Sequence, residues 1–300
     1  MKYYRKEFLS MNPKVGIVLV NYNGESFQNE CIETIKNMDY ENYEVIIVDN
    51  GSKDNSINLV KDYFSDVIII ETCENNGVAK GNNIGIKEAL KRNCEYVLLL
   101  NNDTEVDSNM LTELVKKANE NTMVTCKMYY YKPNNMIWCA GGKINWNRAT
   151  TIHFGDGEID NGQFNEGKYV EYTPTCCLLI HKNIFQKVGF MDEEYFMYYD
   201  DTDFVVRCNN KGIKTWYEPN AKLWHKVSSS SGGALSKISI YYGDRNRLYF
   251  IDKYYKKKFS VLAFFYMSRY IKWIKNKNVK QISQKAIKDY KHNKMFRQNI

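Results

Sequence analysis

Asparagine and aspartate follow each of four apolar segments in the first third of the chain. Because turns favour these residue types, one such loop would carry little meaning. Four of them at corresponding strand ends predict a concave polar site along one edge of a sheet. The polar groups are Asn21, Tyr22 and Asn23; Asp49 and Asn50; the stretch 75–83 with Asn76 and Asn82; and Asn101, Asn102 and Asp103.

The chemistry of this site is constrained by motifs that the sequence lacks. No G-x-G-x-x-G follows the first apolar segment and no G-x-x-x-x-G-K-[ST] occurs, so neither a dinucleotide fold nor a P-loop is supported. A bound diphosphate then needs a hard divalent cation, and Mg²⁺ or Mn²⁺ prefers one or two carboxylates plus substrate phosphates. Asp103, directly after an apolar strand, is the expected ligand.

A second cluster, Asp200-Asp201-Thr202-Asp203, stands at the start of a predicted helix over residues 198–211. Three acids this close repel one another unless a helix N-terminus or a cation compensates. One of them capping the helix is the simpler use. The other is acid–base chemistry, in which one carboxylate takes a proton from an attacking hydroxyl.

The elements that must position these groups alternate in the first hundred residues. Short apolar runs predict buried parallel strands, and helical spacing predicts helices between them. This pattern indicates a Rossmann-like α/β fold with a mostly parallel, doubly wound sheet. The predicted strands are 15–20, 45–48, 67–70 and 96–100, and the helices are 26–38, 56–64 and 83–91.

The pattern changes after residue 107. We expect helices over residues 107–123, 182–188, 198–211 and 241–254, strands over 124–131, 136–146, 170–181 and 214–217, and a loop over 153–169. A Ser/Gly segment, residues 227–233, has the composition of a lid over the site.

Charge is distributed unevenly along the 300 residues. Residues 253–300 hold 14 Lys and Arg against one acid, a net of +13, whereas the other 252 residues are net −6. Apolar and aromatic residues alternate with cations over 256–275, which suits a helix at a membrane surface. Packing of this helix on the body or on a second subunit, giving a homodimer, is the alternative.

The remaining sequence features favour a soluble protein. No secretory signal or membrane-spanning run occurs, and the eight cysteines are scattered without C-x-x-C spacing. We therefore expect reduced thiols and a cytoplasmic location, at the inner face of the cell membrane if the tail binds lipid.

With these residues in view, the order of motifs resembles the family-2 glycosyltransferases. The similar stretches are VGIVLVNYNG, VIIVDNGSKDNS, NNGVAKGNNIG, YVLLLNNDT, VGFMDEEYFMYYDDTDFVVR, LWH and YYGDRNRLYF, between residues 15 and 250. They are most similar to a rhamnosyltransferase-like branch. The resemblance implies a GT-A fold with a nucleotide-sugar-binding half (1–105), an acceptor-binding catalytic half (106–250) and a basic helical tail (251–300).

The resemblance also implies roles for the first cluster. Tyr22 would lie against the nucleobase, Asp49 would accept a hydrogen bond from its ring N–H, and residues 76–83 would close over the nucleoside and sugar. Asn101 and Asp103 occupy the D-x-D positions, at the ribose and the metal. Asn101 replaces the usual acid, and Asn82 stands where many relatives carry an arginine. Asn21, Asn23, Asn76, Asn82 and Asn102 complete the implied nucleotide site.

For the acceptor side, the resemblance implies that Asp201 is the general base of an inverting transfer. Asp200 and Asp203 would orient the acceptor or stabilise the loop, and His225 would reach the metal or diphosphate. Arg245 and Arg247 would balance the leaving-group charge. Salt bridges of these arginines with Asp244 or Asp252 are an equally compatible use.

The implied function is the metal-dependent transfer of a rhamnose, galactose or glucose type of sugar from a UDP- or dTDP-sugar to a glycan or lipid-linked acceptor, in cell-surface polysaccharide or glycoprotein synthesis. A sugar nucleotidyltransferase is an alternative, although the loop after the first strand lacks the cations it would need. A catalytically silent nucleotide-sugar-binding or scaffold protein stays open because of Asn101. Nucleic-acid binding is not expected, since the body is acidic and carries no recognition motif.

Overall fold

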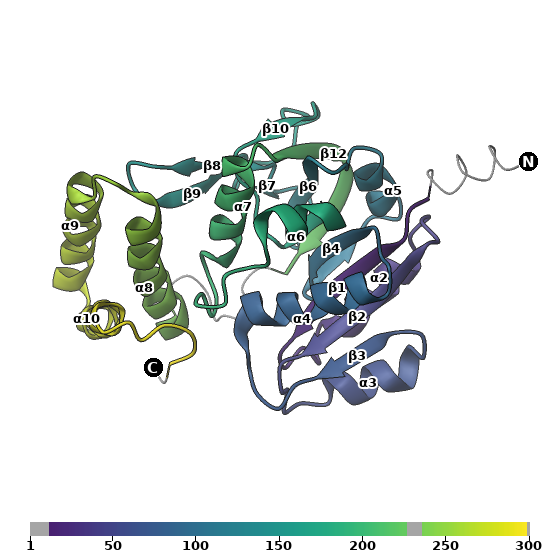
Figure 1. Cartoon of the computed structure of the whole chain (residues 1–300), viewed down its shortest axis with the longest axis horizontal. Helices are drawn as coiled ribbons and strands as arrows, with labels where there is room; N and C mark the ends of the chain where they lie inside the picture. The colour runs from purple at the N-terminus through teal and green to yellow at the C-terminus, as the bar shows by residue number, and fades with distance from the viewer. Residues whose placement is uncertain (1–11, 227–235, 299–300) are drawn as a thin grey trace, which may run out of the picture.

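Four parallel strands form the first half of the sheet, in the spatial order β4-β1-β2-β3 (Figure 1). The computed structural model describes residues 12–226 and 236–298. The strands are β1 (Val15–Asn21), β2 (Tyr43–Asp49), β3 (Ile68–Glu71) and β4 (Tyr96–Asn101), and the helices between them are α2 (Gln28–Lys36), α3 (Ser56–Tyr63) and α4 (Gly77–Lys91). Asn21 pairs in register with Asp49, and Val20 with Asn101, so the carboxyl ends of these strands meet at one edge.

The second half extends the same sheet through an antiparallel strand, so that the order continues β4-β11-β6-β12-β10. These strands are β6 (Thr122–Tyr130), β10 (Lys168–Val170), β11 (Cys177–His181) and β12 (Lys214–His225), with β5 (Thr104–Val106) and β7 (Ile137–Cys139) at the side. β8 (Gly142–Asn145) and β9 (Thr150–His153) form a separate hairpin. The antiparallel pairing of β5 with β12 sets His225 opposite Thr104.

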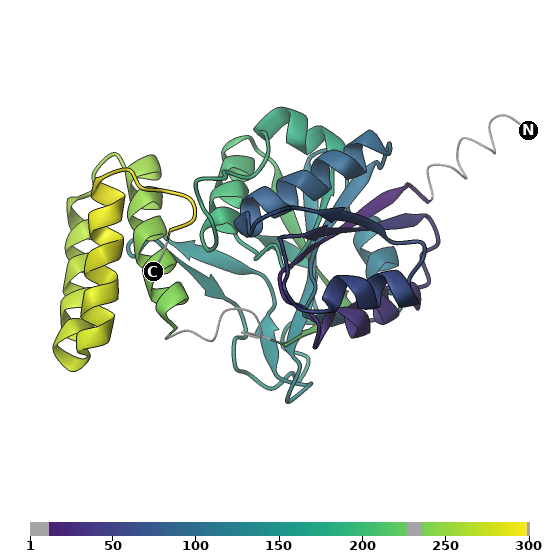
Figure 2. The same cartoon turned by 90° about the horizontal axis from the view of Figure 1, so that it is seen from below.

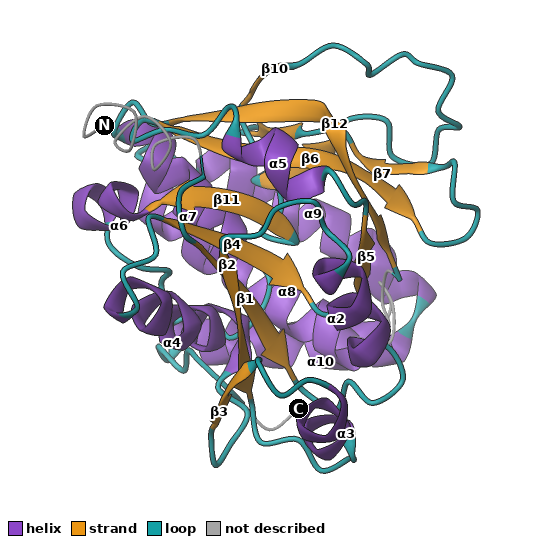
Figure 3. Ribbon diagram, turned by 90° about the vertical axis from the view of Figure 1, so that its right-hand side faces the viewer, coloured by secondary structure: helices purple, strands orange, loops and turns teal. Residues whose placement is uncertain are grey.

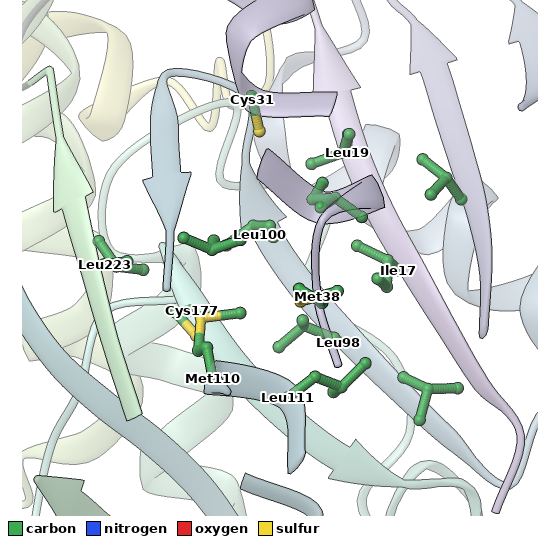
Figure 4. Close-up of a cluster of buried hydrophobic side chains, with 14 of the residues drawn as sticks. Ile17, Leu19, Cys31, Met38, Leu98, Leu100, Met110, Leu111, Cys177 and Leu223 are labelled. Atoms are coloured by element: carbon green, nitrogen blue, oxygen red, sulfur yellow. The ribbon is translucent and has the colours of Figure 1, made fainter. Parts of the chain in front are cut away.

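Helices cover both faces of the sheet (Figure 3). On one face α2, α3 and α5 (Met110–Val115) pack on side chains such as Ile17, Leu19 and Leu98, which Figure 4 shows in one apolar cluster. On the other face α4, α6 (Lys182–Val188) and α7 (Asp200–Asn210) pack on Val18, Val97 and Leu99. β1 therefore alternates its side chains between two cores, which makes the sheet doubly wound, as expected.

Helix α4 approaches β1 unusually closely, and glycines permit it. A Cβ on Gly85 would lie 2.3 Å from Cγ1 of Val18. Gly77 opens the helix with φ +74°, and a Cβ there would lie 2.1 Å from the carbonyl oxygen of Phe196. The amide of Val78 donates to this same carbonyl at 2.8 Å. The first turn of α4 is thereby fixed against the segment that carries Phe196, in the second half of the chain.

The C-terminal region is a bundle of α8 (Lys237–Tyr254), α9 (Phe259–Lys275) and α10 (Lys277–Lys291), which stands at one end of the molecule (Figure 2). α8 and α10 are joined through a hydrogen bond from the hydroxyl of Tyr241 to Asp289 at 2.7 Å. Asp244 accepts from Ser283 of α10 at 2.5 Å and pairs with Arg269 of α9 at 2.6 Å. The basic tail is thus two helices docked on α8, not one, and α8 spans the boundary expected at residue 251.

Several expected elements differ from the structure. The helix predicted over 107–123 is wrong beyond α5, because residues 116–121 are polar and β6 begins at Thr122. α4 begins six residues earlier than expected, at Gly77, and the strand expected to end at residue 217 continues as β12 to His225. The boundary expected after residue 105 falls inside β5. The lid expected over residues 227–233 lies outside the described residues.

All eight cysteines are free, and seven of them are buried. Burial raises the pKa of the Cys31 thiol to about 12 and that of Cys94 to about 11. These thiols are therefore neutral packing groups. No helix in the described ranges combines the length and the apolar character that crossing a bilayer requires.

Candidate active site

A buried hydrogen-bond network holds Asp49 at the end of β2. The Nδ2 of Asn21 donates to Oδ1 of Asp49 at 2.9 Å, and Ser52 donates to the same carboxylate through its hydroxyl at 2.5 Å and its amide at 3.1 Å. Asn102 in turn donates to Oδ1 of Asn21 at 2.9 Å and to Gln28 at 3.3 Å. The network fixes Asp49 at the sheet edge where the resemblance implies a nucleobase.

Three of the residues expected to bind nucleotide make hydrogen bonds that hold the site together. Asn21 is fully buried, and its amide orients Asp49. Asn102 is almost as buried and is used by the same network. Asn23, at φ 55°, accepts from the amide of Lys53 at 2.8 Å and ties the first two loops together. Tyr22 is 40% exposed and presents a ring that a base could contact.

The start of α4 forms the next wall of this region. Asn76 is buried and donates to the carbonyl of Glu74 at 3.1 Å, while Asn50 donates to the carbonyl of Gly77 at 2.9 Å. Asn82 lies one turn further along α4, also buried. These residues join the β2 and β3 loops to the helix.

Asp103 and His225 meet at the end of β5. Oδ1 of Asp103 lies 3.0 Å from Nε2 of His225, and both residues are 6% exposed. Nδ2 of Asn101 lies 3.4 Å from the same ring nitrogen. The amide of Lys226 donates to the carbonyl of Asp103 at 2.9 Å, which continues the β5–β12 pairing past His225. Residues 122 positions apart in the sequence thus form one polar pair.

This pair fits a divalent cation. A carboxylate and an imidazole facing each other supply two protein ligands, and Mg²⁺ or Mn²⁺ takes one or two from the protein when phosphates supply others. The Nδ1 of His225 is buried without a partner among the described residues, so hydrogen bonds within the protein do not exhaust this histidine. No group of three or more His, Cys, Asp and Glu side chains in residues 12–226 and 236–298 has metal-site geometry, so phosphate or water oxygens would complete the shell.

The acidic cluster begins α7, directly after a strained turn. Tyr198 and Tyr199 have φ values of 65° and 68°, a left-handed conformation that costs non-glycine residues about 1–3 kcal/mol each. Asn246 of α8 donates to the carbonyls of Met197 and Tyr198 at 2.8 and 2.9 Å and so holds this turn. Strain retained in this way is typical of functional sites.

The three acids of the cluster have different surroundings. Oδ1 of Asp201 accepts from the amide and hydroxyl of Thr202 at 2.6 and 3.0 Å, and Oδ2 accepts from the hydroxyl of Tyr172 at 2.6 Å. Asp201 is only partly buried. Asp200 is buried, and burial together with repulsion from Asp201 raises the pKa of Asp200 well above its ordinary range. Asp201 is therefore the less buried of the two neighbouring acids, and it is the one expected to act as the base.

Aromatic rings connect the Asp103–His225 pair to Asp201. The His225 ring lies 4.5 Å from Trp138, Trp138 lies 5.0 Å from His153, and His153 stacks on Tyr172 at 5.9 Å, all between ring centroids. Burial lowers the pKa of His153, although the carboxylates of Asp201 and Asp156 oppose this. We call Trp138, His153 and Tyr172 the aromatic wall. It places the expected metal site and the expected base at two ends of one short contact chain.

Three further expected site residues have their contacts within the protein, and those of Asp203 suit the stabilising use expected for it. Asp203 is fully buried and binds Arg207, Lys253 and the hydroxyl of Tyr254 at 2.8, 2.6 and 2.7 Å. Arg245, also fully buried, donates to the carbonyl of Phe296 at 2.5 Å and to Asn246 at 2.9 Å. Arg247 donates to the carbonyl of Arg148. The diphosphate role expected for the two arginines is corrected, because their guanidinium groups hold the C-terminal segment and the β8–β9 turn; the salt bridges to Asp244 or Asp252 are not what they form either.

The aromatic wall and Asn246 were missed by reasoning from the sequence. Trp138, His153 and Tyr172 come from segments expected to be a strand, a loop and a strand, and no spacing relates them to Asp201. Asn246 lies inside the R-N-R motif, but the sequence analysis assigned roles only to the two flanking arginines. The motif was the one signal in the sequence that could have pointed to Asn246.

Comparison with known proteins agrees with this architecture. The profile described as glycosyl transferase family 2 matches residues 16–189. The dTDP-rhamnosyl transferase RfbF of Shigella flexneri is 29% identical over 233 residues, which cover 74% of this chain and 72% of the relative. The low-salt glycan biosynthesis hexosyltransferase Agl10 of Haloferax volcanii is 26% identical over 249 residues, covering 79% and 75%.

Solved structures share the fold at low identity. GalNAc-T7 with UDP, GalNAc and Mn²⁺ superposes with a TM-score of 0.63 at 13% identity, over 82% of this chain but only 49% of that one. TarS 1-349 of S. aureus with UDP-GlcNAc gives 0.58 at 16% identity, covering 93% and 81%. These neighbours are glycosyltransferases of the GT-A fold, as expected. Because the family profile covers more than half of the chain, the protein belongs to glycosyl transferase family 2 and is a glycosyltransferase.

Proposed function

We propose that this glycosyltransferase moves a rhamnosyl or hexosyl group from a UDP- or dTDP-sugar to a hydroxyl of a glycan or lipid-linked acceptor, with inversion at the anomeric carbon. The observation that carries the proposal is the contact chain from Asp103 and His225 through the aromatic wall to Asp201. It connects the residues that we expect at the diphosphate to the carboxylate that we expect to act as the base. A role in glycan biosynthesis is supported by the relative Agl10, a low-salt glycan biosynthesis hexosyltransferase.

In this scheme Asp201 takes the proton of the acceptor hydroxyl. The hydroxyl oxygen forms a bond to the anomeric carbon from the face opposite the nucleotide, and the bond from that carbon to the diphosphate oxygen breaks. The electron pair leaves with the nucleoside diphosphate, so the configuration inverts in one displacement and one carboxylate suffices. The bonds from Thr202 and Tyr172 hold the carboxylate in place for this step.

The donor side rests on Asp49, Tyr22 and the Asp103–His225 pair. Asp49 would accept from the base and Tyr22 would cover it, with Asn101, Asn76 and Asn82 around the ribose and phosphates. Asp103 and His225 would hold Mg²⁺ or Mn²⁺, whose charge when bound stabilises the departing diphosphate. Two structural neighbours support the use of a divalent cation: GalNAc-T7 with UDP and Mn²⁺, and the mannosyltransferase PcManGT of Pyrobaculum calidifontis with GDP-mannose and Mn²⁺.

Replacement of the base tests the proposal. Asp201→Asn keeps the shape and one acceptor oxygen but cannot take a proton, so turnover should fall about 10²–10⁴-fold. Binding of UDP or dTDP with Mn²⁺, measured by calorimetry, should stay within about twofold, since Asp201 contacts no nucleotide in the scheme. Asp62→Asn, an exposed aspartate on α3, is the matched control and should leave both quantities unchanged.

Turnover of Asp201→Asn close to that of the unchanged protein would contradict the assignment of the base. Donor hydrolysis with and without Mn²⁺ separates an enzyme from a silent binding protein. A chain that binds the nucleotide sugar but neither hydrolyses nor transfers it from any UDP or dTDP donor would overturn the proposed function itself.

A further inference from the structure

The outward side of α9 carries a continuous apolar stripe. Six large side chains recur at helical spacing on this side and are exposed: Phe259, Tyr266, Met267, Tyr270, Ile271 and Ile274. Phe259 is 88% exposed and Ile274 69%. Scattered apolar side chains are normal on a protein surface, but a contiguous row of this length marks an interaction face.

The opposite side of the same helix is already occupied. Phe265 is buried with Leu248 of α8 and Ile287 of α10, and Val261 is buried in a cluster that includes Phe250 of α8. Arg269 faces inward to its partner Asp244. The stripe therefore is not the packing face of α9, and α9 lies at the outer edge of the molecule, where a flat surface can reach it (Figure 1).

Exposed lysines bracket the stripe at both ends. Lys256 and Lys257 precede Phe259, and Lys275 and Lys277 follow Ile274. The acid of this region, Asp289, is neutralised by Lys285 at 3.1 Å and accepts from Tyr241. The face thus combines aromatic and aliphatic side chains with uncompensated positive charge.

From this arrangement we propose that α9 docks flat on an anionic lipid bilayer, with its apolar stripe in the headgroup region. A helix of this length, about 25 Å, lying in the interface plane buries such a stripe while its lysines meet lipid phosphates. A second copy of the chain is the poorer occupant, because a two-fold contact would bring two copies of a +13 region together. This surface is separate from the aromatic wall and from the proposed donor site.

Sedimentation of the full chain with vesicles tests the docking. The protein should sediment with vesicles of phosphatidylcholine plus phosphatidylglycerol, and less at high salt, but not with phosphatidylcholine alone. Tyr270→Glu and Ile274→Glu should each lower the partition coefficient about tenfold. Lys275→Gln and Lys277→Gln should each lower it about fivefold, on the anionic vesicles only.

Tyr63→Glu is the matched control, since Tyr63 is 71% exposed on the distant helix α3. It should leave vesicle binding unchanged, and circular dichroism should show all variants folded. Removal of residues 256–300 is not a clean test, because α10 is packed on α8. Equal binding to neutral vesicles, or full binding by Tyr270→Glu/Ile274→Glu, would overturn the proposal. So would a dimer in lipid-free light scattering that this double variant makes monomeric, since that assigns the stripe to a second copy.

Discussion

The hydroxyl of Tyr172 donates to Oδ2 of Asp201 over 2.6 Å, while the opposite oxygen of the same carboxylate is fixed by Thr202. The Asp201 carboxylate is therefore held from two sides, by its own helix and by the segment between β10 and β11. Tyr172 is buried, and its ring stacks on His153 of the aromatic wall. Its position links the orientation of the base to the wall between the two halves of the site.

Tyr172→Phe should lower kcat about 10- to 100-fold, because a hydrogen bond to a charged group contributes about 1.5–3 kcal/mol. KM for the donor should change little, since the bond concerns only the base. Steady-state kinetics measures this split. Tyr217→Phe is the matched control, a buried tyrosine whose hydroxyl donates to the carbonyl of Phe164 at 2.9 Å. An equal fall in kcat in both variants would mean that Tyr172 contributes only to packing.

Asn246 should act as a positioning residue for the acidic cluster. Asn246→Ala leaves the carbonyls of Met197 and Tyr198 without the donor that holds the left-handed turn. A buried polar group without a partner costs about 1–3 kcal/mol, so the free energy of unfolding should fall by roughly this amount. We also expect kcat to fall at least about tenfold while the Kd of the nucleoside diphosphate is kept.

Asn209→Ala is the control for that experiment, since Asn209 lies on α7 and donates to the carbonyl of Glu171 at 2.8 Å without touching the turn. It should lower stability but not kcat. If both asparagine variants lose stability and neither loses kcat, the turn does not position the base.

The pH dependence of stability should report on Asp200. Burial and the neighbouring Asp201 raise its pKa in the folded state, so the folded protein binds a proton there more tightly than the unfolded chain. Its contribution to stability is complete below the ordinary value of 3.8 and is lost as the pH rises through the folded value. Asp200→Asn has no carboxyl group to ionise, so its stability does not fall in this way as the pH rises. The melting temperature of the variant should therefore exceed that of the wild-type protein at neutral pH, and the two melting temperatures should become equal near pH 4.

Asp160 provides a contrast of opposite sign. Burial disfavours its charge, but the Tyr129 hydroxyl and the Lys127 ammonium overcome this and lower its pKa to about 2. Its stabilisation is present above 3.8 and is lost as the pH falls towards 2. Asp160→Asn leaves the buried ammonium group of Lys127 without its ion-pair partner. The free energy of unfolding should therefore fall by about 3–5 kcal/mol at neutral pH. Thermal melts over a pH series distinguish the two aspartates by the sign of the shift.

The edge of the sheet was predictable because local rules determine it. Parallel strands separated by helices put their carboxyl ends together, so Asn21, Asp49 and Asn101 could be assigned to one edge from apolar runs alone. Their individual roles were not predictable. Full burial of Asn21 depends on Asn102, Ser52 and Ser56, which reach it from other loops.

The site contacts in the second half of the chain could not be predicted, because they join residues that are far apart in the sequence. Arg245 and Arg247 have the charge for a diphosphate, but α10 and the segment after it bring carbonyls such as that of Phe296 onto Arg245. The aromatic wall likewise joins residues 138, 153, 172 and 225, whose sequence separation carries no periodic signal. Tertiary packing, not residue type, decided which polar groups of this half serve the site.

Replacement of Asp103 should make the binding of a nucleoside diphosphate independent of the divalent cation. In the unchanged protein, UDP or dTDP should raise the melting temperature more with Mn²⁺ or Mg²⁺ than with EDTA, because Asp103 and His225 together would hold the ion beside the phosphates. Asp103→Asn keeps the shape but removes the charge, so its nucleotide affinity with Mn²⁺ should fall at least about tenfold, to the level seen with EDTA. Asp66→Asn, a surface ion-pair partner of Lys36, should keep the full cation effect. A cation-dependent shift that survives in Asp103→Asn would place the ion elsewhere, and the Asp103–His225 contact would then be an ordinary buried hydrogen bond that joins β5 to β12.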